Sequence, residues 1–344
     1  MDADRLLADL TAGRPAALAR AITMVENGRP GFEQLLASVH QRLGRAHRIG
    51  ITGPPGAGKS TLTEALVRAY RSAGRSVAVV AVDPTSPFSG GALLGDRIRM
   101  ESVALDDGVF IRSMATRGSL GGMAVTTREV CDILDAAGFD RVIIETVGVG
   151  QSEMDVSRAA DSTVLVLVPE SGDGIQTLKS GIMEVADLFV VNKSDRPGAD
   201  KLVREIEISL GIRRGNAFRH VPAHHGARGV RRAAPEAVTE TDAWKQPVIQ
   251  TVASRDEGTS ALLEGLEQHH EWLTSSGTLQ ERRRRRMMER SREVFERALK
   301  RWIWYQTDAE SRLTARLEEE MAGRISPYEV AAEVLEGFKQ GIHA

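Results

Sequence analysis

A glycine-rich run that ends in lysine and serine holds the first residues of this 344-residue chain whose types and spacing could do chemistry. Residues 53–60 read Gly-Pro-Pro-Gly-Ala-Gly-Lys-Ser, which matches the pattern G-x-x-x-x-G-K-[ST]. Glycines let the backbone curl so that several N–H groups point at one anion, and a following helix adds the partial positive charge of its N-terminus. The pattern predicts a phosphate-binding loop. Lys59 is expected to reach the β- and γ-phosphates of a nucleotide, and the Ser60 hydroxyl to bind Mg²⁺.

The sequence on either side of this loop has the pattern that the motif requires. An apolar run at 49–52 leads into it, and apolar residues at 62, 65, 66 and 69 follow with the spacing of a helix that buries one face. An ordinary glycine-rich turn would not need the Lys-Ser pair between a strand and a helix. We assign the phosphates to Gly53, Pro54, Pro55, Gly56, Ala57, Gly58, Lys59, Ser60 and Thr61.

A second motif indicates which base the nucleotide carries. Asn192-Lys193-Ser194-Asp195 follows the apolar run 188–191, and it reads N-K-x-D at the end of a predicted strand. The Asp195 carboxylate can accept from the ring N–H and the exocyclic amine of guanine, two donors that adenine lacks in that arrangement. Charge-assisted hydrogen bonds contribute roughly 1.5–3 kcal/mol each, so two of them favour GTP strongly over ATP. A capped loop between a strand and a helix is the alternative reading.

Three carboxylates are candidates for binding the Mg²⁺ ion. Asp83 ends the second predicted strand, and neighbouring parallel strands deliver their carboxyl ends to one crevice. Asp96 lies in a glycine-rich loop that follows. Glu145 ends the buried run 142–144 and precedes Thr-Val-Gly, the place where related nucleotide sites carry Asp-x-x-Gly. A structural pairing of Glu145 with Lys59 is the alternative.

The chain lacks the glutamine that orients the attacking water in Ras-like proteins. The position just after the glycine is Val149, and the nearest glutamine is Gln151. We therefore expect slow intrinsic hydrolysis, completed by another loop or by a partner. Residues 170–179 form one candidate loop, and Arg117 is a weaker candidate for a stabilising arginine.

Composition places the chain among soluble proteins with a sizeable core. It is 42% hydrophobic and 27% charged, with a net charge of −2, so we expect neither nucleic acid nor membrane as a partner. The start of the chain is acidic and unlike a signal peptide, which favours a cytoplasmic location. The lone cysteine, Cys131, is expected to be a buried core thiol. The run Arg282–Arg286 is offset by nearby glutamates at helical spacing, and it is interpreted as a solvated or intersubunit salt-bridged helix face.

Apolar runs separated by helical patterns predict an α/β fold. Continuous apolar strands indicate a mostly parallel sheet with helices on both faces, as in P-loop NTPases, here with helical N- and C-terminal extensions. The segment 211–243 has no period and is predicted to be a surface insertion. The predicted strands lie at 48–52, 77–82, 109–111, 142–144, 164–168, 188–191 and 247–249.

The last 65 or so residues are again helical in pattern. Apolar side chains including Phe295, Trp302 and Tyr305 recur at alternating spacings of three and four, Asp308 could cap the next helix, and Ser326-Pro327-Tyr328-Glu329 reads as a capping box. Such a stripe needs a partner surface. We expect that surface to be a second copy of the chain, with the chain's own core as the alternative.

Together these motifs resemble the MeaB/ArgK GTPases, which are chaperones of adenosylcobalamin-dependent acyl-CoA mutases and relatives of the human methylmalonic-aciduria type A protein. The run Glu145-Thr-Val-Gly-Val-Gly-Gln-Ser-Glu153 is the most specific part of a likeness that extends from about residue 15 to 335. The resemblance implies a GTPase chaperone of a methylmalonyl-CoA mutase type enzyme and a homodimer. Its domains are an N-terminal extension (1–46), a GTPase domain (47–276) and a C-terminal dimerisation arm (277–344).

The resemblance also implies roles for single residues. Mg²⁺ would be held by Ser60, Asp83, Asp96 and Glu145, and residues 170–179 would relay the nucleotide state to the mutase through Gln176 and Lys179. Gly174 stands there where the family often has an acid. The guanine carbonyl would be backed by Val252, Ala253 and Ser254. The resulting catalytic set is Lys59, Glu145, Gln176 and Lys179.

Two other classes share parts of this pattern. A nickel-insertion GTPase has the same core but usually carries a His-rich tract or Cys-x-Cys ligands, whereas this chain offers only the pairs 224–225 and 269–270. A kinase acting on a periplasmic-transport protein would need a catalytic base beside an acceptor site, which the sequence does not show clearly.

Overall fold

A computed structural model describes residues 3–84, 100, 102–116, 125–146, 152–169, 181–213 and 243–342. The chain divides into two compact units, Met1–Gln280 and Glu281–Ala344. Each unit is described by itself. No helix in these ranges is both long and apolar enough to span a bilayer.

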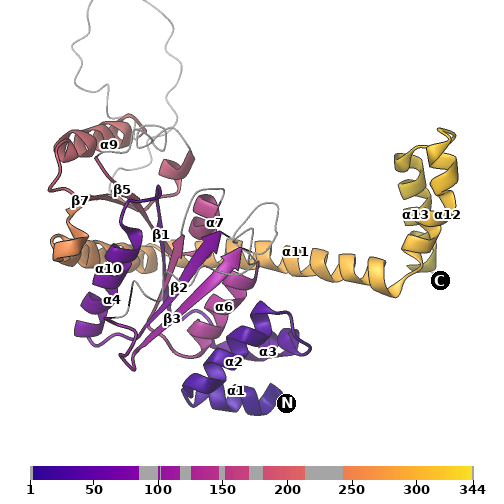
Figure 1. The fold of residues 1–344 in the computed structure, drawn as a ribbon, viewed down its shortest axis with the longest axis horizontal. Helices are drawn as coiled ribbons and strands as arrows, with labels where there is room; N and C mark the ends of the chain where they lie inside the picture. Colours follow the sequence, from indigo (N-terminus) through magenta and orange to yellow (C-terminus); the bar gives the residue numbers. More distant parts are fainter. Residues whose placement is uncertain are drawn as a thin grey trace, which may run out of the picture. The chain divides into compact units, whose positions relative to one another are not determined.

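Parallel strands of the first unit form one sheet, and every apolar run predicted as a strand is part of it (Figure 1). In the described residues the strand order is β3-β2-β4-β1-β5-β6-β7, with β1 between the two halves of the sheet. Because chain order reverses around β1, the loop after it opens into the crevice where such sheets bind ligands. The strands are β1 (His47–Thr52), β2 (Val77–Pro84), β3 (Val109–Thr116), β4 (Arg141–Thr146), β5 (Ser162–Leu167), β6 (Leu188–Asn192) and β7 (Val248–Thr251).

Helices of the first unit begin and end where local signals place them. Pro15 fixes the backbone at the start of one helix, and Gly28, at a φ of 56°, ends it. Gly58 precedes another at a φ of 85°. The helices are α1 (Ala3–Thr11), α2 (Pro15–Glu26), α3 (Phe32–Val39), α4 (Lys59–Ser72), α6 (Val125–Ala136), α7 (Ser152–Ala159), α9 (Ala199–Arg213) and α10 (Thr259–Ser275).

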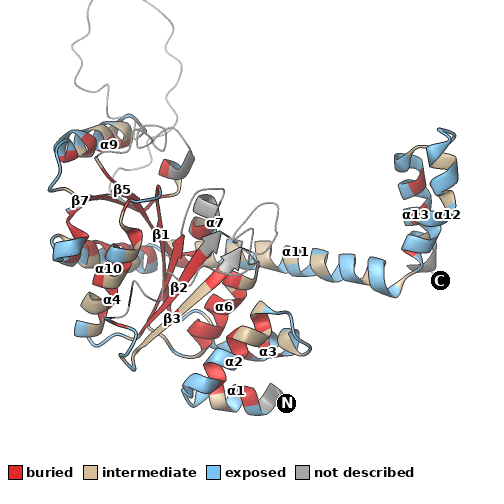
Figure 2. Cartoon of the chain, in the orientation of Figure 1, coloured by how far each residue is buried: buried red, intermediate tan, exposed pale blue. Residues whose placement is uncertain are grey.

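The sheet is buried between helices on both faces (Figure 2). Helices α4 and α10 pack with the side chains that β1, β5 and β6 direct to one face, such as Ile49 and Val190. On the other face α1, α2, α3, α6 and α7 cover β2 and β4, while α9 covers the alternate residues of β5 and β6. Gly50 permits the close approach of α7, because a Cβ atom there would lie 2.4 Å from Val156 Cγ1. Cys131 is buried as predicted. The α/β fold class is therefore confirmed.

The N-terminal helices share this core. Leu10, Ile22, Val25 and Leu35 are buried in the same cluster as side chains of β2, β4 and α6. A buried polar joint adds to the packing: Asp135 of α6 accepts from the N–H groups of residues 44, 45 and 46, at 2.9–3.1 Å. Arg48 of β1 donates to both Asp132 (2.7 Å) and Asp135 (3.0 Å).

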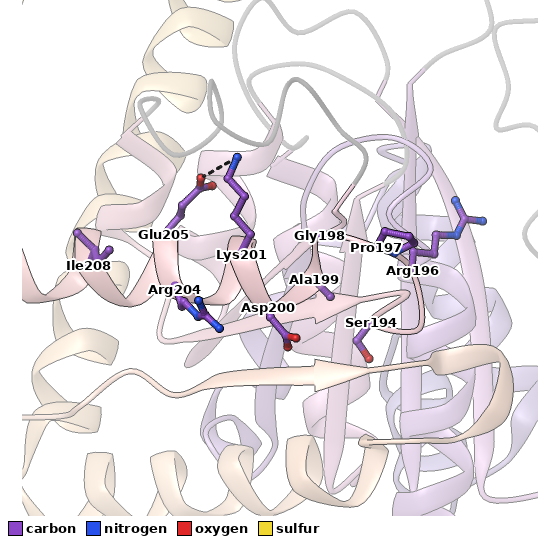
Figure 3. A pocket seen from close by; sticks show the side chains of 10 residues that line it. All are labelled: Ser194, Arg196, Pro197, Gly198, Ala199, Asp200, Lys201, Arg204, Glu205 and Ile208. Carbon is purple, nitrogen blue, oxygen red and sulfur yellow. Dashed lines mark ion pairs between the residues drawn. The ribbon is translucent and has the colours of Figure 1, made fainter.

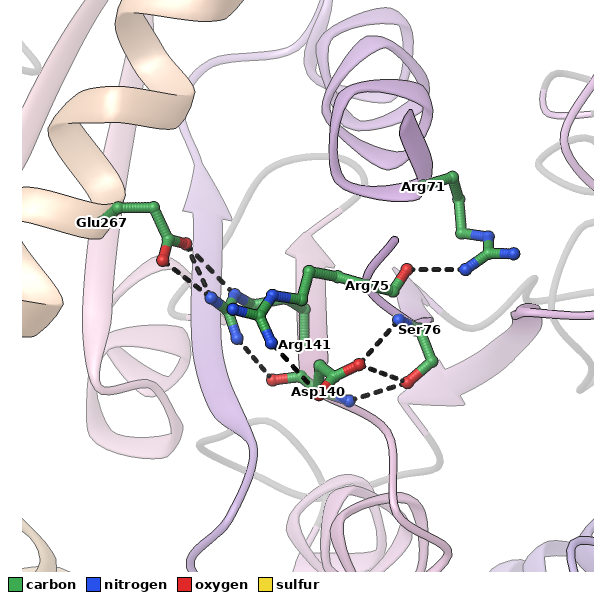
Figure 4. Close-up of polar contacts among 6 residues, drawn as sticks. All are labelled: Arg71, Arg75, Ser76, Asp140, Arg141 and Glu267. Atoms are coloured by element: carbon green, nitrogen blue, oxygen red, sulfur yellow. Dashed lines mark hydrogen bonds and ion pairs between the residues drawn. The ribbon is translucent and has the colours of Figure 1, made fainter. Parts of the chain in front are cut away.

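At the edge where β2 and β4 begin, polar groups join neighbouring elements (Figure 4). The Ser76 amide and hydroxyl donate to Asp140 at 2.8 and 2.9 Å, and Arg141 binds Glu267 of α10 with two nitrogens. Burial alone would raise the pKa of Asp140, but the hydrogen bonds from Ser76 outweigh it and lower that pKa. These contacts lie at the end of the sheet opposite the loop after β1, and they link β2 and β4 to α10 there.

The second unit is helical, as predicted, and it contains all of α11 except the first three residues. Its helices are α11 (Thr278–Gln306), α12 (Ala309–Met321) and α13 (Pro327–Ile342). The predicted capping box forms: the Ser326 amide donates to Glu329 at 2.8 Å, and the Glu329 amide donates back to Ser326 Oγ at 3.3 Å. Asp308 stands at the start of α12 but makes no side-chain cap; its carboxylate binds Arg312 at 2.9 Å instead.

The predicted insertion at 211–243 begins later than expected. Residues 211–213 are the last turn of α9, because the helical pattern of that segment continues to Arg213. Residues 214–242 lie outside the described ranges.

Candidate nucleotide-binding site

The loop between β1 and α4 has the backbone of a phosphate-binding loop. Gly53, Gly56 and Gly58 have φ values of 141°, 73° and 85°, which non-glycine residues rarely adopt. Space is also limited, since a Cβ atom on Gly53 would lie 2.1 Å from the carbonyl oxygen of Val166. The predicted strand–loop–helix arrangement is therefore present, and the N-terminus of α4 opens at the loop.

Lys59 is buried with its ammonium group inside the loop. Its Nζ donates to the carbonyl oxygens of Gly53 (2.8 Å) and Pro54 (3.0 Å). This places a positive charge beside the N–H groups at the start of α4. The charge and the helix dipole act in the same direction, and both favour an anion such as a phosphate group.

Ser60 and Glu145 meet across the carboxyl ends of β1 and β4. Ser60 Oγ donates to Glu145 Oε1 at 2.6 Å, because β1 pairs in register with β4 up to Ile51 and Glu145. A hydroxyl and a carboxylate are the oxygen donors that Mg²⁺ prefers, so the pair fits the predicted magnesium site. The backbone of Asp83 follows on β2, which pairs with β4 through Val82 and Thr146. Asp96 lies outside the described residues.

The predicted base site is a cavity of about 150 Å³ between the loops after β6 and β7. Asn192 joins three elements there: its Nδ2 donates to the carbonyl of Ala57 (2.8 Å), and its Oδ1 accepts from Thr251 Oγ1 and the Ala253 amide, both at 3.1 Å. The side chain thus fixes the phosphate loop against both base loops. The cavity is lined by Gly58, Thr61, Asn192, Lys193, Asp195, Arg196, Val252, Ala253 and Ser254.

Lys193 holds an unusual backbone conformation at this cavity. Its φ is 57°, in the left-handed region that is uncommon for residues other than glycine. Two backbone hydrogen bonds hold the turn. The Ser194 amide donates to the carbonyl oxygen of Thr251, and the Arg196 amide donates to the carbonyl oxygen of Lys193. Such conformations concentrate at ligand sites, where the surroundings maintain them. The turn directs the Lys193 side chain to the cavity wall and brings Asp195 to the same wall.

Some predicted residues cannot be placed. Gln176 and Lys179 of the third loop, and Val149, Gln151 and Arg117, lie outside the described ranges.

A more open hollow of about 550 Å³ lies beside the base site (Figure 3). It is formed by the end of the loop after β6 and by the first turns of α9, where Lys201 and Glu205 pair at 3.8 Å. The sequence did not point to it, because its side chains belong to the outer face of an ordinary helix. Two arginines near the base loops, Arg68 and Arg255, were also missed. The only available signal was that Arg255 follows Ser254 directly.

The fold and this site define a P-loop nucleotide-binding protein whose base cavity carries an Asn-Lys-x-Asp loop. Comparison with known proteins makes the class more specific, because the family model described as "Methylmalonyl Co-A mutase-associated GTPase MeaB" matches residues 18–308. The chain belongs to this family and is a GTPase. The resemblance inferred from the sequence motifs is confirmed.

Individual relatives agree with the family. A relative from Pyrococcus abyssi that carries a GTPase name is 45% identical over 286 residues, covering 83% of this chain and 82% of its own. The mitochondrial "methylmalonic aciduria type A homolog" of Mus musculus is 36% identical over 294 residues, 81% of this chain and 66% of its own. A crystal structure of a "LAO/AO transport system kinase" is similar at a TM-score of 0.64 and 27% identity, covering 98% and 97% of the two chains.

Proposed function

We propose that this GTPase is a chaperone of an adenosylcobalamin-dependent acyl-CoA mutase of the methylmalonyl-CoA mutase type. Its nucleotide cycle would gate the loading of the cofactor into the mutase and protect or reactivate that enzyme. The observation that supports this most directly is the family match over residues 18–308, because the family is described by its association with methylmalonyl-CoA mutase. The name of the mouse relative points the same way.

The chain's own residues account for binding of the nucleotide. Lys59 and the amides at the start of α4 hold phosphate oxygens, and the charge on Lys59 offsets theirs. Ser60 and Glu145 would hold Mg²⁺, with Asp83 and Asp96 as further expected ligands. When bound, Mg²⁺ neutralises charge on the phosphates. Asp195 accepts from guanine, and the backbone of Ala253 backs the base.

Hydrolysis by the isolated protein should be slow, because valine at position 149 cannot orient a water molecule. The third loop, with Gln176 and Lys179, would complete the site when a mutase is bound. This coupling links the rate of hydrolysis to the presence of the client enzyme.

A homodimer built on the C-terminal helices is part of the proposal. Several large apolar side chains on α11 are exposed, with Phe295 at 65% and Tyr305 at 83%. Trp302 instead contacts Phe338 of α13, with ring centroids 5.8 Å apart. The residues outside that contact are therefore the ones available to a second copy.

GTP turnover with and without a methylmalonyl-CoA mutase tests the function. We expect a low basal rate that rises when the mutase is added. Lys179→Ala should lose most of this stimulation while GTP affinity changes little, and Lys201→Ala, on the exposed side of α9, should be stimulated normally. A high basal rate that no mutase alters, or normal stimulation of Lys179→Ala, would contradict the proposal.

Of the two alternative classes, the nickel-insertion GTPase gains no support from the described residues. They contain no group of three or more His, Cys, Asp or Glu side chains placed to hold a metal ion. Equilibrium dialysis against nickel in a large excess of Mg²⁺ distinguishes a nickel-insertion GTPase, since a dedicated nickel site should retain the metal whereas the Mg²⁺ site should not.

A further inference from the structure

The two loops that form the base cavity are joined by an ion pair across its rim. Arg255 Nη2 donates to Asp195 Oδ2 at 3.4 Å. Asp195 follows β6, whereas Arg255 ends the short 3-10 turn Ala253–Arg255 after β7. The carboxylate assigned to guanine is thus held by a cation from the opposite loop.

The turn that carries Arg255 is itself fixed to the phosphate-binding helix. Arg68 of α4 donates through Nη2 to both carboxylate oxygens of Asp256, at 2.8 and 3.0 Å. Its Nη1 donates to Glu64 one turn earlier, at 2.9 Å, which orients the guanidinium along the helix. The pair of Arg68 with Asp256 joins residues that are 188 positions apart in the chain.

Backbone constraints leave this turn little freedom. Asp256 has a φ of 58°, and the next glycine, Gly258, has a φ of 79°. A Cβ atom on Gly258 would lie 2.1 Å from the carbonyl oxygen of Gln250. The Val252 amide donates to the Glu257 carbonyl at 3.0 Å and closes the turn. Arg255 therefore projects from a turn whose backbone is held by these contacts and by the ion pair of Asp256 with Arg68.

This geometry matters for selecting the base. Two donors of guanine must meet two oxygens of one carboxylate, so the rotation of the Asp195 side chain has to be restricted. A partner that restricts it before the base arrives reduces the entropy lost on binding. Arg255 and Asp195 are 60% and 36% exposed, so their pair contributes little to folding. Its effect should therefore appear in nucleotide selection rather than in stability.

We propose that Arg255 is a positioning residue for guanine recognition. It holds the Asp195 carboxylate toward the base, and Arg68 braces the turn from which Arg255 reaches. This inference rests on the assignment of Asp195 to the base and deepens the proposed GTPase site.

The test compares the binding of GTP and ITP, because hypoxanthine lacks the exocyclic amine that guanine offers to Asp195. We expect Arg255→Gln to weaken GTP about 3- to 10-fold and ITP much less, so that the ratio of the two affinities falls. Arg255→Lys should restore most of the ratio. Arg68→Met should also lower the ratio of GTP to ITP affinity, but by less than Arg255→Gln. Arg20→Met, an exposed arginine on α2, should leave it unchanged, and melting temperatures should be similar throughout.

A double-mutant cycle separates positioning from a general structural effect. In an Asp195→Asn background, Arg255→Gln should cause no further loss of GTP affinity, because it acts through that carboxylate. If Arg255→Gln leaves the ratio of GTP to ITP affinity unchanged, the proposal is overturned while Asp195 stays at the base. The same holds if the losses of GTP affinity from the two substitutions are additive. Unchanged GTP affinity in Asp195→Asn alone would show instead that the base binds elsewhere, and both assignments would fail together.

Discussion

Single side chains in this protein join distant parts of the nucleotide site. Asn192 contacts the phosphate loop through Ala57 and the loop after β7 through Ala253. Gly58 must lack a side chain for the same reason, since a Cβ atom there would lie 2.4 Å from Asn192 Nδ2. The base and phosphate ends of the site are therefore mechanically connected by one amide.

Base selection at this scale depends on the charge of Asp195. Asp195→Asn replaces an acceptor by an amide whose NH₂ group faces guanine donors, so GTP affinity should fall by roughly 100-fold or more. Xanthine carries a carbonyl where guanine carries its amine, and XTP should bind better to the variant than to the parent protein. Equilibrium titration with both nucleotides measures the exchange. Equal GTP affinity in the two proteins would exclude this loop as the base site.

At the scale of elements, the segment that enters β1 is joined to α6 by one buried carboxylate. Asp135 accepts from three successive amides and from Arg48. Asp135→Ala removes the acceptor of the buried Ala46 amide and one of the two carboxylates that bind Arg48, so we expect the free energy of unfolding to fall by about 1–3 kcal/mol. Asp9→Ala removes the surface pair with Arg14 and should cost about 0–1 kcal/mol. Urea unfolding compares them, and similar losses for both would show that the buried joint is not special.

The contact between β1 and α10 should make stability depend on pH. His47 donates or accepts at Ser162 Oγ (2.7 Å) and stacks on His270, and burial followed by the charge of His270 holds its pKa well below the usual value. His269 and Arg141 act in the same direction, whereas Asp161 opposes them. Protonating this ring inside the fold is therefore unfavourable.

The sign of the effect follows from the lowered pKa. Below about pH 6.5 the unfolded chain binds a proton at His47 that the native protein does not. The free energy of unfolding should then decrease as the pH falls, by up to about 1.4 kcal/mol per pH unit from this group, and be independent of it above pH 7.5. Urea midpoints between pH 7.5 and 5.5 measure the slope. His47→Gln should reduce the slope and the exposed His40→Gln should not; equal slopes in all three proteins would contradict the argument.

At the scale of the whole molecule, the two ends of the chain have different roles in stability. The N-terminal helices are part of the core, where each fully buried aliphatic side chain contributes about 1.5–3 kcal/mol. The C-terminal helices belong to a separate compact unit. The first should be indispensable for folding and the second dispensable.

Two truncations test this difference. A chain ending at Gln280 should fold, bind GTP and be monomeric, because it keeps the whole first unit and lacks the exposed apolar side chains of α11. A chain lacking residues 1–46 should fail to fold, since the lost burial is comparable with the 5–15 kcal/mol that stabilises a typical domain. Light scattering and GTP titration measure both outcomes. Full-length protein that stays monomeric at micromolar concentration would refute the dimer arm.

The sequence by itself determined the features that depend on neighbours along the chain. The Gly-x-x-x-x-Gly-Lys-Ser loop, the apolar runs that became strands, the start of α2 at Pro15 and the capping box at Ser326 are all local patterns. Each is fixed by backbone preference or by hydrogen bonds within a few residues. This is why the fold class and the position of the phosphate loop could be predicted correctly.

Only the tertiary structure decided what depends on contacts between distant residues. It set the strand order around β1 and placed Glu145 against Ser60. It also brought Arg255 to Asp195 and Arg68 to Asp256. Spacing along the chain carries no information about such pairs, because their distance is set by how helices pack on the sheet. The base site was therefore recognisable from its motif, whereas the arginines that hold it could be found only in the folded molecule.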